Sequence, residues 1–407
     1  GSGNSNQAAR VGALISTEKQ CGGDLVTGTH LPPEIQGQLL TGRFKSRTVV
    51  RYEFIENGAG FSANVLPPLI SSKHPNFRPV DCKIGPDGAI YVADWYNSII
   101  NHAQHDFRDP RRDHEHGRIW RITHKERPLV QKPKLVGESI VDLLGHLKSP
   151  NAWTRHQTRK ELSERDPDAV LKATEAWVET LKPTDAGHDG HLVEAMWACQ
   201  NVERSSELIL NRVINAKDGH ARSAGARVLR YWHASLPDPV SMIATLAADP
   251  FPRTRMEAVL SAGFIPKTEA FTASLNVLDY KQDSFIGTAL SQTVNALEPY
   301  WQPKLESGEL VFSKPEHRDF AGRIGALRFD ERLRDFLRNR MPKADEIAAI
   351  KALFIVEAKE AQVKTVYRSL TSRRSRLSRE SRLALLEGLA EIGRKGGRSL
   401  GGRIESL

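Results

Sequence analysis

The chain has 407 residues, of which 39% are hydrophobic and 26% are charged, and its formal net charge is +9. This length is sufficient for two or three domains with large buried cores. No apolar run approaches the roughly 18 residues of a membrane-spanning helix, so no transmembrane segment is predicted. Because Gly1 to Asn4 have neither the charged nor the apolar region of a signal peptide, we expect no signal peptide in this chain.

We predict that residues 1–127 form β-structure, because short stretches of β-branched residues alternate with turns that contain glycine, proline and asparagine. Two turns, at Asn57-Gly58 and Asp87-Gly88, have the residues that tight hairpins need. The strands recur in units of roughly 45 residues, the size of a propeller blade. A closed propeller needs at least about four blades, so we interpret this region as about two C-terminal blades of a β-propeller. The expected strands are Gly37–Phe44, Thr48–Phe54, Val80–Ile84, Ala89–Asp94 and Gly117–Ile122, the last with Ile119 and Ile122 buried.

Residues 128–138 are interpreted as a linker, after which the hydrophobic period changes to that of an α-helix. Within residues 139–298 similar helical units recur about every 30 to 37 residues, which predicts an α-solenoid of HEAT-like repeats whose stacking buries their apolar faces. Residues 299–407 predict further helical repeats with a basic C-terminal tail.

Two sets of residues recur in the helical region. The arginines stand at one position of the repeat, and we expect them to make structural bonds between neighbouring units. Most of the tryptophans are expected in the core or between repeats, and a carbohydrate-binding platform is the alternative. The arginines are Arg155, Arg222 and Arg255, and the tryptophans are Trp153, Trp177, Trp197, Trp232 and Trp301.

The segment Asn76–Ile122 resembles the end of the β-propeller in the large membrane-bound dehydrogenase-like proteins of planctomycetes and related bacteria. Their propeller is similar to that of soluble quinoprotein sugar dehydrogenases, and HEAT-type repeats follow it. The resemblance covers about residues 20–125 well and the remainder more loosely. Upstream residues that fit the same pattern are Cys21-Gly22-Gly23-Asp24, Gly28-Thr29-His30-Leu31-Pro32 and Gly58-Ala59-Gly60-Phe61.

The resemblance implies a C-terminal fragment of a quinone-dependent sugar or alcohol dehydrogenase from the periplasm or cell envelope. Pyrroloquinoline quinone and calcium would belong to the complete protein, and we expect no cofactor within this chain. We also expect the chain to be inactive alone, because a partial propeller cannot enclose a cofactor. Family members usually carry a CxxCH haem motif after the repeats, and this sequence has none.

The candidate site is the His- and Asp-rich stretch from His102 to His116. Its histidines and aspartates have plausible metal-ligand spacings but match no defined metal motif, so a polar loop is the simpler interpretation and no metal is predicted. The resemblance implies a histidine general base beside the quinone, with arginines near the cofactor. Histidine has a pKa suited to that role, and a guanidinium matches a carboxylate of the quinone. His102 and Arg108 are the candidates, whereas Asp94 is expected to cap the turn at Tyr96-Asn97.

Two other functions remain open. The surface of the helical repeats could act as a scaffold that binds a protein partner. A sugar substrate would be a separate ligand of the dehydrogenase-like part. The C-terminal region from Thr365 to Leu407 contains ten Lys and Arg against four Asp and Glu, but no aromatic residues interleave with its arginines, so nucleic-acid binding is ranked last. The three cysteines are expected to be buried thiols, and a Cys21–Cys82 disulfide would require an oxidising compartment.

Overall fold

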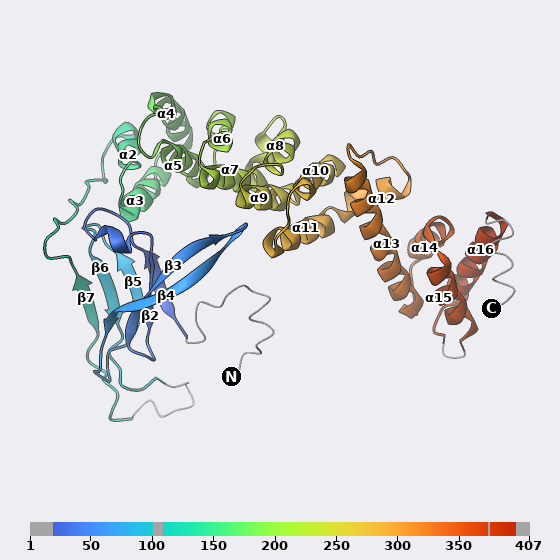
Figure 1. Cartoon of the computed structure of the whole chain (residues 1–407), viewed down its shortest axis with the longest axis horizontal. Helices are drawn as coiled ribbons and strands as arrows, with labels where there is room; N and C mark the ends of the chain where they lie inside the picture. Colours follow the sequence, from blue (N-terminus) through green and yellow to red (C-terminus); the bar gives the residue numbers. More distant parts are fainter. Residues whose placement is uncertain (1–18, 101–108, 373–374, 396–407) are drawn as a thin grey trace. The chain divides into compact units, whose positions relative to one another are not determined.

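A computed structural model describes residues 19–100, 109–372 and 375–395 of the chain. Strands come first and helices follow, as the sequence predicts (Figure 1). The contacts divide the chain into two compact units: the first runs to Ile265 and includes Asp279–Thr293, and the second contains Pro266–Leu278 and the residues from Val294 onward. None of the helices in the described part of the chain combines the length and apolarity that crossing a membrane requires.

Two antiparallel sheets form the β-region, and in each sheet consecutive strands are neighbours. Both predicted hairpin turns are confirmed, since Gly58 and Gly88 have φ values of 61° and 79°, which favour glycine. One buried cluster contains residues of both sheets, including Leu40 and Val92. The first sheet contains β1 (Cys21–Leu25), β2 (Leu39–Arg43), β3 (Thr48–Asn57) and β4 (Gly60–Ser71), and the second contains β5 (Pro79–Ile84), β6 (Ile90–Asp94) and β7 (Arg118–Ile122).

Three strands differ from the expectation, and one of them is β1, which the sequence does not predict. Ile119 is 75% exposed, although the sequence predicts it to be buried together with Ile122. Residues three apart point to opposite faces of a strand, so only one of the two can face the core, and Ile122 packs there. The strand β4, which contains Pro67 and Pro68, is not among those expected from the sequence. It is an edge of its sheet, where a missing amide donor is tolerated.

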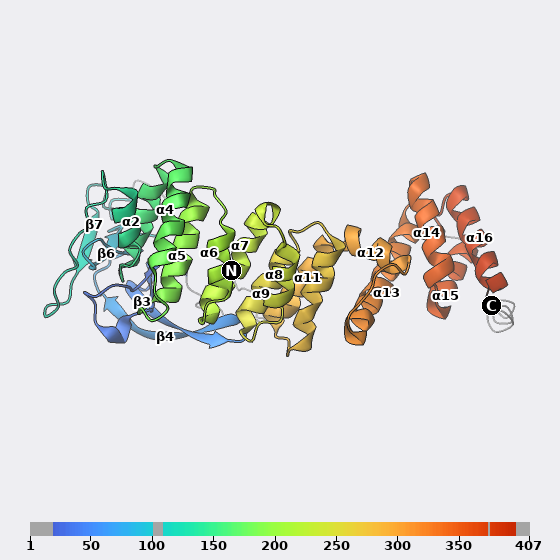
Figure 2. The same cartoon turned by 90° about the horizontal axis from the view of Figure 1, so that it is seen from above.

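The helices of the first unit form a regular stack (Figure 2). From α2 to α9, each odd-numbered helix packs against the even-numbered helix before it, and the odd-numbered helices pack on one another in order. Polar side chains such as Asn151 and Asp218 cap the helix starts by accepting from backbone N–H groups. The helices are α2 (Ile140–His146), α3 (Ala152–Ser163), α4 (Pro167–Thr180), α5 (His188–Asn201), α6 (Glu207–Ile214), α7 (Gly219–Trp232), α8 (Pro239–Leu246), α9 (Pro252–Ala262), α10 (Thr268–Ser274), α11 (Ser284–Ala296), α12 (Glu298–Glu306), α13 (Pro315–Arg338), α14 (Ala344–Glu357), α15 (Glu360–Thr371) and α16 (Arg379–Lys395), with short 3-10 helices at Pro33–Ile35, His233–Ser235 and Leu275–Asp279.

Two of the three recurring arginines make the predicted bonds between neighbouring units. All three donate to backbone carbonyls of the turn that precedes their own helix. Arg155 also pairs with Glu194 of α5 at 2.8 Å, and Arg222 pairs with Asp249 before α9 at 2.6 Å, so two of the three connect neighbouring helix pairs. The accepting carbonyls belong to Ser149 for Arg155, to Ala216 and Lys217 for Arg222, and to Asp249 and Pro250 for Arg255.

The second unit has a core of its own. Trp301 of α12 is fully buried, stacks on Phe271 with ring centroids 4.8 Å apart, and donates through Nε1 to the carbonyl of Val294. A separate cluster that includes Phe336 and Phe354 joins α13 to the helices that follow it. These helices therefore bury their apolar faces on one another, as the sequence predicts for residues after 299.

The three cysteines are free thiols. Cys82 and Cys199 are buried, as expected, whereas Cys21 is only partly buried. Burial raises the pKa of the Cys82 and Cys199 thiols to about 12, so both stay protonated at neutral pH. They act as small apolar side chains in the core.

Candidate functional site

The two candidate catalytic residues, His102 and Arg108, lie outside the residues that the structure describes. Asp94, at the end of β6, is described and is buried. Its Oδ1 accepts from the backbone nitrogens of Arg78 and Tyr96 at 2.7 and 3.0 Å, and its Oδ2 accepts from Nε1 of Trp120 at 3.0 Å. The interpretation of Asp94 as the cap of the turn after β6 is confirmed.

The second half of the His- and Asp-rich stretch forms a local turn. Asp113 accepts from the backbone nitrogens of Glu115 and His116, and its carboxylate also bonds Nδ1 of His116. These bonds, the two backbone ones first, lower the pKa of Asp113. In the part of the chain that the structure describes, no three or more His, Cys, Asp or Glu side chains lie together in a way that could hold a metal ion.

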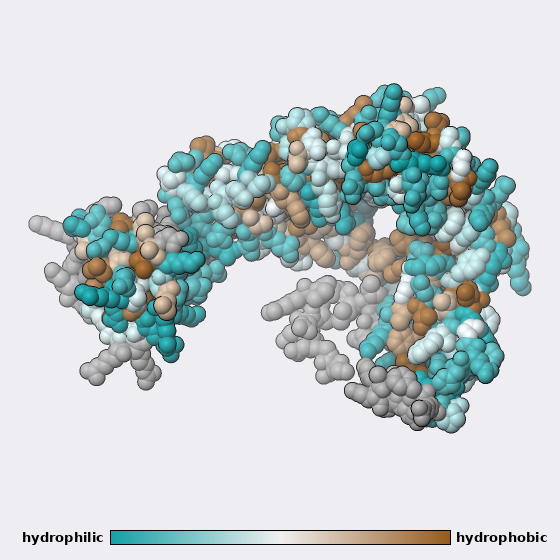
Figure 3. All heavy atoms as spheres, turned by 180° about the vertical axis from the view of Figure 1, so that it is seen from behind, coloured by the Kyte–Doolittle hydropathy of each residue, from teal (hydrophilic) through white to brown (hydrophobic). Residues whose placement is uncertain are grey.

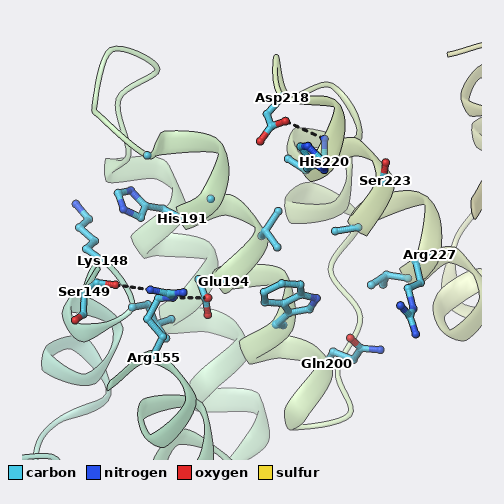
Figure 4. Close-up of a pocket in the computed structure, with 18 of the residues that line it drawn as sticks. Lys148, Ser149, Arg155, His191, Glu194, Gln200, Asp218, His220, Ser223 and Arg227 are labelled. Carbon is cyan, nitrogen blue, oxygen red and sulfur yellow. Dashed lines mark hydrogen bonds and ion pairs between the residues drawn. The ribbon is translucent and has the colours of Figure 1, made fainter. Parts of the chain in front are cut away.

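A groove of about 920 Å³ lies along the helical part of the first unit (Figure 4). It is lined by the odd-numbered helices α3, α5, α7 and α9 and by the turns that lead into them. Since these helices pack side by side in order, a single hollow crosses four consecutive helix pairs. Concave surfaces made in this way are the usual binding surfaces of stacked helical repeats.

The hairpin that β3 and β4 form contacts Arg253, one of the residues that line the groove. The guanidinium of Arg253, at the start of α9, donates to the carbonyls of Ala59 and Gly60 and to the carboxylate of Glu56, and lies 3.6 Å from the ring centroid of Phe61. Figure 3 shows an opening between this hairpin and the helices. The hairpin therefore connects the β-region to α9 across the face that carries the groove.

The helix α11 holds the same hairpin tip. Asp283, just before α11, accepts from the backbone nitrogen of Ala59 at 2.7 Å. A Cβ added to Gly58 would lie 2.2 Å from that carboxylate, and one added to Gly60 would lie 2.4 Å from the ring of Phe285. Both glycines are needed for this close contact, and Gly58 is also needed for the turn.

His191 interrupts the arginine series inside the groove. It is the fourth residue after the N-cap of α5, Gly187, the position that Arg155 occupies in α3 and Arg222 in α7. The Nδ1 atom of His191 is buried and has no hydrogen-bond partner among the described residues. Burial first, and then the positive charge of Lys148, lowers the pKa of His191, so its imidazole is neutral at neutral pH.

Two cations and two aromatic rings of the groove are accessible to a ligand. Lys148 and Arg227 are exposed and have no acidic partner in the described part of the chain. Trp197 is 37% exposed and Tyr231 58% exposed. Trp197, which lines the hollow, is thus an exception to the expectation that most tryptophans of the helical region lie in the core or between repeats.

A second hollow, of about 700 Å³, separates the β-region from α3. Its lining includes Lys83 and Tyr91 from the sheet side and Trp153 and His156 from α3. Arg159 borders this hollow and also pairs with Glu194, which lines the groove. The two hollows are thus neighbours along α3.

The groove and its residues are not evident from the sequence. Lys148, Arg227 and Trp197 belong to no motif, and their common location depends on how the helices stack. The available signal was the arginine position itself. In the unit that contains α5 the sequence has His191 at the position where the units of α3, α7 and α9 have arginine. The unit of α11 also lacks the arginine, so this signal alone does not single out the groove.

Comparison with known proteins adds one match. Residues 3–126 fit the model of a domain of unknown function, DUF7133. No curated protein and no solved structure matches the chain. The matched segment contains both sheets and ends before α2, so it does not include the groove.

Proposed function

We propose that the chain is a scaffold of HEAT-type repeats that binds a segment of a partner protein. The groove carries this proposal, because four consecutive helix pairs contribute to one continuous hollow with exposed aromatic and cationic side chains. The repeated arginine bonds support the assignment to HEAT-type repeats, since all three arginines fix their helix to the turn before it and two of them also bind the next helix pair. The hairpin contact with α9 supports a frame of fixed geometry around the groove.

A site-specific cross-link tests the scaffold. A photoreactive benzoylphenylalanine in place of Arg227, inside the groove, is expected to give one or a few discrete adducts in an extract of the source cells. The matched control carries the same group in place of Glu207, an exposed residue of the even-numbered helix α6. Identical adducts from the two positions, or none from position 227, would contradict the proposal.

We propose a second role for the β-region, as the last part of a propeller in a quinoprotein-like dehydrogenase of the periplasm or cell envelope. The consecutive antiparallel order of β1 to β4 favours it, because a propeller blade is a four-stranded antiparallel sheet. The described residues do not assemble a calcium site, and the guanidinium of Arg78 is occupied by backbone carbonyls. Quinone and calcium therefore remain an expectation for a complete propeller, in which further blades would supply their ligands.

This second role predicts that the chain alone does not oxidise sugars. With pyrroloquinoline quinone and calcium added, dye reduction in the presence of glucose should stay at the rate of a protein-free control. The physical reason is that about two blades leave a cofactor open to water, whereas a closed propeller has at least about four. Clear turnover above the control would show that this chain completes a site by itself.

A further inference from the structure

We propose that the groove recognises an acidic segment that also carries apolar side chains, with one carboxylate bound between Lys148 and His191, another at Arg227, and an apolar side chain on Trp197 and Tyr231. This inference rests on the proposed scaffold function and specifies the chemistry of its partner. It follows from three separate features of the groove: an unsatisfied polar atom, an excess of cationic groups and an aromatic surface.

The unsatisfied atom is Nδ1 of His191. At the corresponding position, Arg155 and Arg222 fill the space with guanidinium groups that bond the carbonyls of the preceding turn. The shorter imidazole makes no such bond, which leaves a buried nitrogen without a partner among the described residues at the edge of the groove. Buried polar groups are normally satisfied, and a turn of the imidazole toward the groove, which His191 lines, would let a ligand oxygen satisfy this one. Figure 4 shows Lys148 on the same side of the groove as His191.

The charges of the lining favour an anionic ligand. Glu194 is shared by two arginines, Arg155 and Arg159, so this cluster keeps one positive charge in excess. Lys148 and Arg227 add two more cations that have no acidic partner in the described residues. The other acidic side chains are engaged: Glu257 pairs with Arg230, and Asp218 caps α7.

The chain already places one of its own carboxylates at the end of this groove. Glu56, on the hairpin, bonds Arg253 and lies 3.4 Å from Nε2 of His220, at the starts of α9 and α7. Helix starts favour negative charge because their free N–H groups carry partial positive charge. The start of α5 has no side-chain cap and lies beside Lys148 and His191. The carboxylate in its first turn, Asp189, is engaged with His188 and the backbone nitrogen of Asp218, so the start of α5 can also accept an anion one helix pair earlier.

The floor of the groove suits apolar side chains. Trp197 and Tyr231 expose ring surface, and Val193 and Val228 lie between the helices. Burial of one aromatic or leucine side chain against such a surface should strengthen binding, because it removes apolar area from water. The cations then set the orientation and select acidic over neutral segments.

Binding of a carboxylate at His191 should be linked to a proton. In the free protein the pKa of His191 is lowered by burial and by Lys148 and His188, against the weaker opposite effects of Asp185 and Glu194. A carboxylate next to Nδ1 favours the imidazolium and raises this pKa. Binding then takes up a proton, so affinity rises as the pH falls below neutral and levels off below the pKa of the free state.

The probe for the test is a fluorescein-labelled peptide, Asp-Glu-Phe-Asp-Glu-Leu-Asp, titrated with the whole chain and followed by fluorescence anisotropy. The comparison peptide has Asn and Gln in place of Asp and Glu. We expect the acidic peptide to bind at least about fivefold more tightly at low salt, since exposed charge pairs contribute modestly and several act together, and this preference should shrink as salt is added. Equal binding of the two peptides, or no binding of the acidic one, would overturn the inference.

Variants locate the site. Lys148→Ala and Arg227→Ala should each lower the affinity for the acidic peptide about three- to fivefold. Lys160 is an exposed lysine of α3 that does not line the groove, so Lys160→Ala should leave this affinity unchanged. His191→Gln should remove the pH dependence without loss of the folded state, as checked by circular dichroism. A pH dependence that persists in His191→Gln would contradict the carboxylate position.

The two proposals fail in different ways. Adducts from position 227 together with no preference for the acidic peptide would retain the scaffold and reject the acidic segment. If position 227 gives no adducts, the scaffold itself fails, whatever the peptide does.

Discussion

Replacing Arg222 with methionine is expected to destabilise the first unit by about 3 kcal/mol, since removal of one partner from a largely buried ion pair leaves the other charge without compensation. Arg222 donates to both carboxylate oxygens of Asp249 and to two backbone carbonyls, and both side chains are mostly shielded from water. Asp249 would retain only its bond from the backbone nitrogen of Phe251. Urea unfolding followed by circular dichroism measures the loss.

Arg227→Met is the matched control for this prediction. Arg227 lies on the same helix, α7, but is exposed and has no acidic partner in the described residues. Its replacement should change the free energy of unfolding by less than about 0.5 kcal/mol. Equal effects of the two substitutions would mean that the Arg222 pair does not hold neighbouring helix pairs together.

Arg253→Ala is expected to release the tip of the hairpin from α9. The substitution removes bonds to Glu56 and to the carbonyls of Ala59 and Gly60, together with the stacking on Phe61. Hydrogen bonds that involve a charged group are each worth about 1.5 to 3 kcal/mol, but the bond to Glu56 is weakened because that carboxylate is half-exposed. The two carbonyl bonds, each at the lower end of this range, then give a total of about 3 kcal/mol, which corresponds to local opening about a hundredfold more frequent. Hydrogen exchange of a peptide covering residues 54–63, read by mass spectrometry, should accelerate by that factor.

The control for the hairpin is Glu53→Ala. Glu53 lies on the same strand, is exposed, and has no ion pair in the described part of the chain. Its removal should leave the exchange of residues 54–63 within about threefold of the wild type, because exposed substitutions change stability little. If Arg253→Ala does not accelerate exchange, Asp283 alone suffices to hold the tip at Ala59.

These two substitutions act on the frame of the groove at different points. Arg222 fixes α7 to the turn before α9, and Arg253 fixes the hairpin to α9 itself. A partner that binds along the odd-numbered helices needs both contacts, since the relative position of α5, α7 and α9 defines the hollow. We therefore expect each of the two variants to lose peptide binding in addition to stability.

The sequence by itself determined the local features. The turns at Gly58 and Gly88, the cap at Asp94 and the bonds of the recurring arginines all follow from residues close together in the chain, or from a repeat in which each unit meets the next. The order of strands before helices follows from the change of hydrophobic period. These signals are local, so they can be recognised without knowing how distant segments pack.

Only the tertiary structure decided where the groove lies and what surrounds it. Asp283 meets Ala59 across 224 residues of sequence, and Arg253 meets Ala59 across 194, separations at which no sequence pattern specifies a contact. His191 shows most clearly the limit of what can be predicted from the sequence. The sequence shows that His191 replaces an arginine. Its Nδ1 atom has no hydrogen-bond partner among the described residues. This atom becomes part of a binding surface only because the stacking of the helices brings Lys148 and the start of α5 to the same edge of the groove.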